Sequence, residues 1–277
     1  MRYVTVVALA VALWGQTAAA QFFVTECGVT VPDGVDAVLN ADLDCSIHDT
    51  SPAVTLGTRS TFDLRGFTLT VPAVAQHAVR CCDSLQKSCW CKVINGRFVG
   101  PGGGVSSGAN LIATDLVMEG AAGVRASGRV TATNLDITDS PARCIYGQKV
   151  KARDITCTDC GTMGIVGRTV RAEDVVVTGC KGAGIDAFSG KARVKRATVT
   201  GNGFDPRPGD GSGGVIASRV VVVDSTVTGN FAGPLLAPSD TPMDVFSERK
   251  PRLKNTTCVY SGRYGGYDEP WGVCTAD

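Results

Sequence analysis

The chain of 277 residues repeats itself about every twenty residues through its central part. The segment KVKARDITCTDC, from Lys149, restates RVTATNLDITDS, from Arg129, with cysteine and charge changed but the apolar positions kept. Six segments superpose column by column, beginning at Asn110, Arg129, Lys149, Thr169, Lys191 and Arg219. A period this short leaves no room for a strand plus a crossover helix, so each repeat can form one coil of a β-solenoid.

Each repeat alternates apolar and polar residues, as in Val150-Lys151-Ala152-Arg153, which is the periodicity of a β-strand. Two apolar columns run through the alignment: Val130, Val150, Val170, Ala192 and Val220; and Ile137, Cys157, Val177, Val199 and Val227. The regular Leu/Asn signature of leucine-rich repeats is missing, and an immunoglobulin-like sandwich would show no fixed-period column match. The composition of 34 Gly and 6% aromatic residues suits many short strands joined by tight turns. We therefore predict an all-β parallel solenoid whose coils stack at ~4.8 Å.

Two insertions interrupt the period. The step between repeats grows from 20 to 22 and then 28 residues near residues 204–214, and a second insertion lies near Asp240. Insertions into a solenoid become loops on its flank, and such loops either carry function or are simply tolerated. The sequence leaves both alternatives open.

The first twenty residues predict a signal peptide. Arg2 precedes an apolar run from Val4 to Trp14, and small residues end at Ala20. No later stretch approaches the ~20 apolar residues of a membrane span. We expect residues 21–277 to form one domain, exported to the extracellular space or the periplasm, and to be monomeric.

All 12 cysteines lie beyond Ala20, and an even number in an exported chain predicts disulfides. We expect Cys27–Cys45 to close the N-terminal end and Cys258–Cys274 the C-terminal end. Cys160 and Cys180 share a column on adjacent coils, which predicts a bridge between them and leaves Cys144 for Cys157. The group Cys81, Cys82, Cys89 and Cys91 predicts two local bridges of open connectivity, with a zinc site that includes His77 as the weaker alternative.

The run from Asp42 to Thr70 resembles the N-terminal part of secreted right-handed parallel β-helix proteins of the pectin-lyase-like superfamily. In that group a Leu-x-Cys precedes an apolar strand and then a Leu-Asp-Leu-Asn-Gly-His-Thr-like strand. Here the latter reads Phe62-Asp63-Leu64-Arg65-Gly66-Phe67-Thr68, and the ending WGVC from Trp271 is also similar. The resemblance implies a right-handed parallel β-helix with disulfide-stapled ends. It does not bring the family's catalytic motifs, because the paired-Asp, Gly-His-Gly and Arg-x-Pro-x-x-Arg elements are absent.

Basic residues occupy outward columns beside the inward apolar ones. With Val150 and Ala152 inward, Lys151, Arg171 and Arg193 form one column. Parallel columns hold Arg153 and Lys195, interrupted by Glu173, and Arg129, Lys149, Lys191 and Arg219. We expect a cationic strip that binds an acidic polysaccharide, with Arg207 adding to it, or that simply keeps an exposed sheet soluble. A net charge of +1 does not favour nucleic acid as a partner.

A polar column of Asn134, Asp154, Asp174, Arg196 and Asp224 runs beside the strip. Stacked carboxylates raise each other's pKa unless a cation compensates, so Asp154 and Asp174 predict either a Ca²⁺ site or a structural role at turns. If the protein is an enzyme, the predicted catalytic set is Asp154, Asp174, Arg196 and Tyr146, acting as a uronate polysaccharide lyase or C5-epimerase. The alternative is a non-catalytic structural, adhesive or carbohydrate-binding surface protein.

Overall fold

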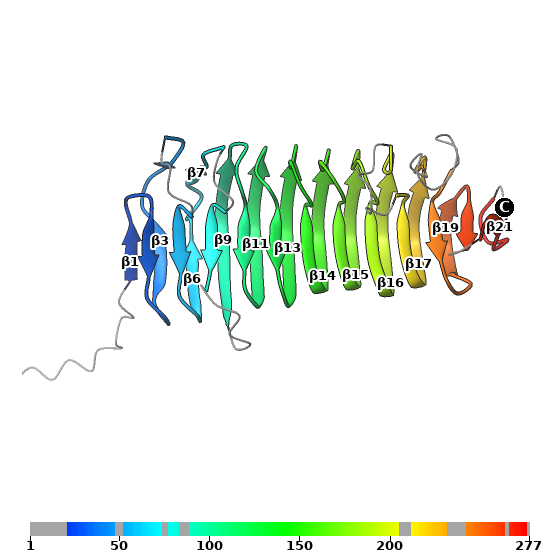
Figure 1. Ribbon diagram of the computed structural model, residues 1–277, viewed down its shortest axis with the longest axis horizontal. Coiled ribbons are helices and arrows are strands. Elements are labelled where there is room, and N and C mark those ends of the chain that lie inside the picture. The colour runs from blue at the N-terminus through cyan, green and yellow to red at the C-terminus, as the bar shows by residue number, and fades with distance from the viewer. Residues whose placement is uncertain are drawn as a thin grey trace, which may run out of the picture.

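The computed structural model describes residues 21–47, 52–73, 77–82, 89–204, 212–231, 242–263 and 266–275. The predicted signal peptide, residues 1–20, lies outside this part of the chain. The described residues form a right-handed parallel β-solenoid with 62% strand, in which a parallel sheet of 12 strands turns 320° around the axis. They include no helix, and in Figure 1 the coils follow one another in sequence order from one end to the other.

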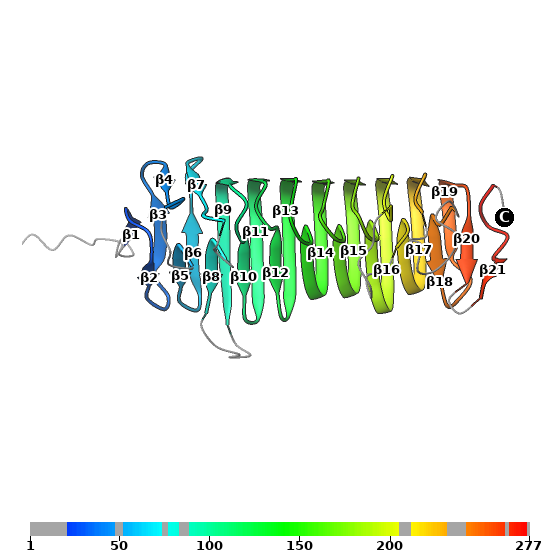
Figure 2. The ribbon, with the colours of Figure 1, turned by 45° about the horizontal axis from the view of Figure 1, so that its top comes forward.

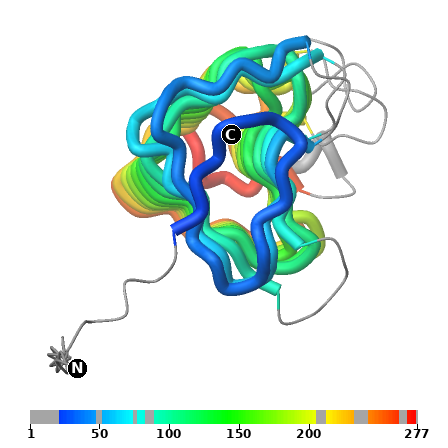
Figure 3. Tube along the Cα trace, turned by 90° about the vertical axis from the view of Figure 1, so that its left-hand side faces the viewer, coloured from blue at the N-terminus to red at the C-terminus, as the bar shows by residue number. Residues whose placement is uncertain are grey.

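Each coil has three walls, and Figure 3 looks along the axis onto the stacked coils. The first wall begins with β2 (Val29–Val31), β5 (Val54–Leu56), β8 (Val79–Cys81), β10 (Val105–Ser107) and β12 (Val124–Ala126). It continues through the start of four long strands, β14 (Ile145–Thr158), β15 (Ile165–Thr178), β16 (Ile185–Thr200) and β17 (Val215–Thr228). It ends with β18 (Val245–Ser247) and β20 (Ser261–Arg263), and β21 (Gly266–Pro270) pairs antiparallel with β20.

The second and third walls are formed largely by single strands that bend around a corner. The second wall starts with β1 (Gln21–Val24), β3 (Asp36–Leu39) and β6 (Ser60–Asp63), and the third with β4 (Leu43–Asp44) and β7 (Thr68–Thr70). From there β9 (Trp90–Val99), β11 (Asn110–Glu119), β13 (Arg129–Thr138), the four long strands and β19 (Arg252–Cys258) run through both walls. Figure 2 shows these strands as a continuous series along the axis.

The predicted columns are confirmed by the strand register. Val130, Val150, Val170, Ala192 and Val220 pair in succession, as do Ile137, Cys157, Val177, Val199 and Val227. Every residue in both columns is buried. Like residues therefore lie above like because each inward side chain packs mainly on the coils before and after it.

The corner before the first wall brings two coils into very close contact. A Cβ added to Gly123 would lie 1.8 Å from the carbonyl oxygen of Cys144 on the next coil. A side chain cannot fit in that distance, so only glycine permits this approach of two backbones.

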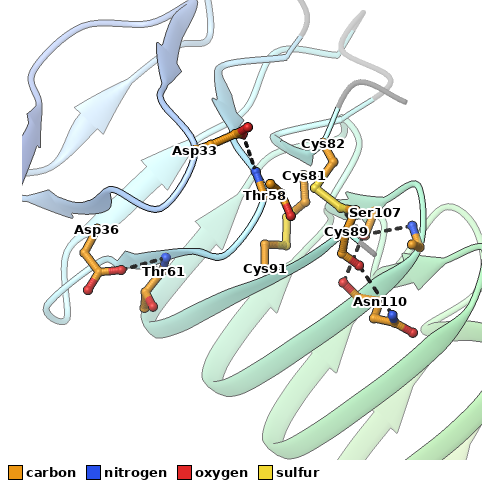
Figure 4. Close-up of a disulfide and its surroundings, with 11 residues drawn as sticks. Asp33, Asp36, Thr58, Thr61, Cys81, Cys82, Cys89, Cys91, Ser107 and Asn110 are labelled. Atoms are coloured by element: carbon orange, nitrogen blue, oxygen red, sulfur yellow. Dashed lines mark hydrogen bonds between the residues drawn. A yellow bond between two sulfur atoms is a disulfide. The ribbon is translucent and has the colours of Figure 1, made fainter. Parts of the chain in front are cut away.

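The N-terminal coils are less regular and are tied by side chains. Figure 4 shows the Asp33 and Asp36 carboxylates accepting hydrogen bonds from the backbone N–H groups of Thr58 (2.7 Å) and Thr61 (3.0 Å). The same view contains two neighbouring disulfides, Cys81–Cys91 and Cys82–Cys89. All four cysteines of this group therefore form disulfides, and their connectivity is settled. None of them is left as a thiolate ligand for the alternative zinc site.

Three further disulfides each close one coil. Cys27–Cys45 and Cys258–Cys274 confirm the predicted bridges near the two ends. The third joins Cys144 to Cys160, so the predicted Cys160–Cys180 and Cys144–Cys157 bridges are wrong, and Cys157 and Cys180 are free and buried. Cys144 and Cys160 face each other across the interior of one coil, and each sulfur can form only one bridge, so Cys157, whose sulfur lies within 4.8 Å of both, and Cys180 remain thiols.

Candidate functional site

The outward side chains of the second wall form a surface that we call the cationic face. Its members are Lys151, Arg171, Arg193 and Arg252; Arg153, Lys195 and Lys254; and Arg129, Lys149, Lys191 and Arg219. Register pairs Lys151 with Arg171 and Arg171 with Arg193, as predicted. Val221 separates Arg193 from Arg252 in this column. Because the wall is parallel, successive cations lie one rung, ~4.8 Å, apart.

Part of this face is neutralised by acidic neighbours. Glu173 accepts a hydrogen bond from Arg196 (2.7 Å) and lies 3.6 Å from the Lys195 ammonium. Arg153 is 3.6 Å from Asp154. Among the described residues, Lys151, Arg171 and Arg193 form no ion pair and are exposed, so the middle column holds the charge available to a ligand.

The polar column of predicted catalytic and metal-binding residues marks the corner between the second and third walls. Asn134, Asp154, Asp174, Arg196 and Asp224 all have left-handed backbone conformations, with φ between 48° and 55°. Asp and Asn are among the non-glycine residues that best tolerate this conformation. The bend in each strand is a sufficient reason for the residue types in this column, which supports the structural role at turns.

The carboxylates of this corner are held by neighbours in the same column. Arg196 donates to Asp174 through Nε (2.6 Å) and Nη2 (2.6 Å), and the Asn134 amide donates to Asp115 (2.6 Å). The bidentate hydrogen bonds from Arg196 lower the pKa of Asp174, and its hydrogen bond to Glu173 lowers the pKa of that residue as well. A carboxylate stabilised in its ionised form by a fixed guanidinium is a poor proton acceptor.

Tyr146 lies apart from the rest of the predicted catalytic set. It is on the first wall, between Arg125 and Val166 in the register, and packs against a buried apolar cluster with Met163 and Val166. The Arg143 guanidinium lies over its ring, 5.0 Å from the centroid. The structure therefore brings Asp154, Asp174 and Arg196 together in one column, with Tyr146 on another wall. Arg207, the remaining predicted ligand residue, is outside the described residues.

A calcium site gains no support from the groups that converge. Within the described ranges, only Cys144, Cys157 and Cys160 form a cluster of three potential metal ligands, with their sulfur atoms within 4.8 Å of one another. Two of these sulfurs form a disulfide. Burial is the main cause that raises the pKa of Cys157, and burial also raises the pKa of Cys180 to about 12, so both remain protonated thiols at neutral pH.

Two hollows at the edge of the cationic face were missed from the sequence. One, of about 570 Å³, is lined by Trp90, Asn110, Ile112, Arg129 and Lys149 among others, and Trp90 is 39% exposed. The other, of about 340 Å³, is lined by Lys191, Arg219, Val220, Val221, Arg249, Lys250 and Arg252. Trp90 precedes the repeats and residues 249–252 follow them, so column alignment could not place either group. The basic run ERKPR, from Glu248, was the available signal for the second hollow.

The two hollows lie along one column. The column runs Trp90, Asn110, Arg129, Lys149, Thr169, Lys191 and Arg219, with the Arg129 N–H donating to the Asn110 side chain (3.1 Å). Six rungs separate its ends, about 29 Å along the axis. A linear ligand that follows the axis can therefore contact an exposed indole, a row of cations and a second group of cations.

These features define a class: a disulfide-stapled parallel β-solenoid with an exposed cationic face. Comparison with known proteins adds no narrower class, because no family model, curated protein or solved structure matches the chain. The described residues contain no helix that is long and apolar enough to span a membrane.

Proposed function

We propose that the protein binds an acidic polysaccharide along its cationic face, without catalysing a reaction on it. The observation that carries this proposal is the column of Lys151, Arg171 and Arg193, which is exposed, regularly spaced and without ion pairs among the described residues. Three stacked like charges repel one another, and a polyanion would offset that repulsion.

The spacing of the face suits a polysaccharide. The rungs repeat every ~4.8 Å, close to the rise of one sugar unit in an extended polymer, so successive uronate carboxylates can meet successive cations. Trp90 adds an exposed aromatic ring at one end, and the face of such a ring packs against the apolar face of a sugar. The ligand class is thus an extended chain with about one negative charge per unit.

Binding is favoured over the lyase or epimerase alternative by the state of the acidic residues. Asp174 is engaged by Arg196, Asp154 lies beside Arg153, and Tyr146 is on another wall. A lyase or epimerase needs a base poised to remove the C5 proton, next to a group that neutralises the carboxylate. Of the predicted catalytic residues, Asp174 is held by Arg196 and Tyr146 lies on another wall, which favours binding over this chemistry.

An exported location forms part of the proposal. Five disulfides are compatible with an oxidising compartment, where acidic polysaccharides are abundant. Membership of the pectin-lyase-like superfamily is likewise proposed, on the solenoid fold and the sequence resemblance around residues 42–70.

The test is binding of polygalacturonate by variants of the middle column. We expect the triple variant Lys151→Gln, Arg171→Gln and Arg193→Gln to bind about tenfold more weakly, because each exposed contact is worth roughly 0.5 kcal/mol. The control pair compares Arg171→Gln with Arg125→Gln, which removes the same charge from an exposed residue of the first wall. Isothermal titration calorimetry at low salt measures the affinities. Equal affinity of the triple variant and the unmodified protein would refute the proposal.

A further inference from the structure

The smaller hollow concentrates five basic side chains at the C-terminal end of the cationic face. Lys191 and Arg219 are successive members of one column, while Arg252 follows Val221 in the next. Arg249 and Lys250 come from the turn between β18 and β19. All five line a space of about 340 Å³, and Val220 and Val221 complete its lining among the described residues.

The turn that carries Arg249 is fixed by hydrogen bonds. The Arg249 N–H donates to the Ser218 carbonyl (3.3 Å), and the buried Ser247 hydroxyl donates to the Arg249 carbonyl (2.8 Å). The Trp271 indole N–H donates to the Ser247 carbonyl (3.3 Å). The backbone at this point is therefore set by its neighbours, and the side chains project from a defined frame.

The charge of the hollow is not balanced within the part of the chain that the structure describes. None of the five side chains forms an ion pair there, in contrast to Lys195 and Arg196, which share Glu173. Five cations around one small space repel one another, which costs stability unless an anion enters. Three of them are arginines, whose planar forks donate paired hydrogen bonds to oxyanions.

We propose that this hollow binds the sulfate or phosphate groups of an acidic polysaccharide. The inference rests on the proposed function, since it assigns the charge type of the same ligand. A uronate chain brings one carboxylate per ~5 Å rung, so few carboxylates reach the hollow together. Sulfate and phosphate groups bring three or more oxygens on one centre and can engage several of the five donors at once.

The first experiment uses inorganic anions and thermal unfolding. An anion that binds only the folded protein raises its melting temperature. We expect millimolar sulfate or phosphate to raise it by about 3 °C relative to chloride at equal ionic strength. The double variant Arg249→Gln and Lys250→Gln should lose this shift, while Arg125→Gln should keep it. Sulfate also stabilises proteins by exclusion from their surfaces, so the test compares the anion-dependent shift in melting temperature between variants. Equal shifts in all three proteins would overturn the proposal and indicate that general effect alone.

The second experiment identifies the source of the oxyanion and separates this inference from the proposed function. Dextran sulfate, phosphorylated dextran, polygalacturonate and uncharged dextran are titrated into the unmodified protein and the double variant. We expect the double variant to bind the preferred substituted dextran at least tenfold more weakly and polygalacturonate less than threefold more weakly. The substituted dextran bound more tightly by the unmodified protein names the source. Equal losses for all anionic polymers would overturn the selectivity. Should polygalacturonate fail to bind while the anion-dependent melting shift persists, the proposed function fails and the oxyanion site stands.

Discussion

At the scale of single residues, the backbone bend explains the residue types of the polar column better than a catalytic or metal-binding role does. Asp154, Asp174 and Asp224 are acidic where a left-handed residue is required, and Arg196 occupies the same conformation one rung after Asp174. The left-handed conformation is unfavourable for arginine, and the bidentate hydrogen bonds from Arg196 to Asp174 offset that cost. The corner therefore accounts for the carboxylates in this column without a catalytic role.

Because the Cys180 thiol is free and buried, we expect alkaline pH to lower the stability of the protein. The folded-state pKa of Cys180 is raised to about 12 from an ordinary value of 9.0, mainly by burial. A raised pKa contributes stability that is fully present below pH 9 and is lost between pH 9 and 12, because only the unfolded thiol ionises there. The slope is at most about 1.4 kcal/mol per pH unit for one thiol.

Urea unfolding followed by circular dichroism measures this slope. We expect the free energy of unfolding to fall less steeply above pH 9 in Cys180→Ala than in the unmodified protein, since other titrating groups are common to both. Peptide mapping of the disulfides after each measurement excludes exchange with the nearby Cys144–Cys160 bridge. Parallel pH profiles for the two proteins would contradict the assignment.

At the scale of elements, a buried polar ladder holds the corner after the third wall. The Asn202 amide donates to Asn230 (2.9 Å), and the Asn230 amide donates to Asp244 (3.0 Å) and to the Val199 carbonyl (2.9 Å). Asn202, Asn230 and Asp244 are fully buried. The ladder satisfies backbone groups that the turns between coils leave without strand partners.

Replacing Asn230 by Ala should be far more costly than replacing an exposed strand residue. The change removes hydrogen bonds to buried groups on two neighbouring coils, and we expect a loss of about 2–4 kcal/mol in the free energy of unfolding. Thr226→Ala, at an exposed position of β17, should change it by less than about 0.5 kcal/mol. Denaturation with urea gives both values, and similar losses for the two variants would show that the ladder is not a major source of stability.

Element-scale features also show what could be predicted from the sequence. The inward columns and the basic columns were predictable because the repeats can be aligned from the sequence alone. The strand register pairs the same residues that this alignment places in one column. The Cys144–Cys160 bridge was not, because it closes a coil and depends on which side chains face each other across its interior. The two hollows depend on Trp90 and on residues 249–252, which lie outside the repeats.

At the scale of the whole molecule, the solenoid converts a short repeat into a long charged surface. A net charge of +1 conceals a wall whose middle column is basic on three successive coils. This column lies on the second wall, and the hollow of five cations adds to its charge at the C-terminal end. Such an arrangement favours a linear polyanion over a compact ligand.

The central claim is that charge on this wall binds the ligand, and salt dependence tests it most directly. The measurement is the affinity for polygalacturonate as a function of sodium chloride, for the unmodified protein and for the triple variant of Lys151, Arg171 and Arg193. We predict that the affinity of the unmodified protein falls at least tenfold between about 50 and 200 mM salt, and that the variant shows a shallower slope. An affinity that is independent of salt, or the same slope in both proteins, would contradict the account.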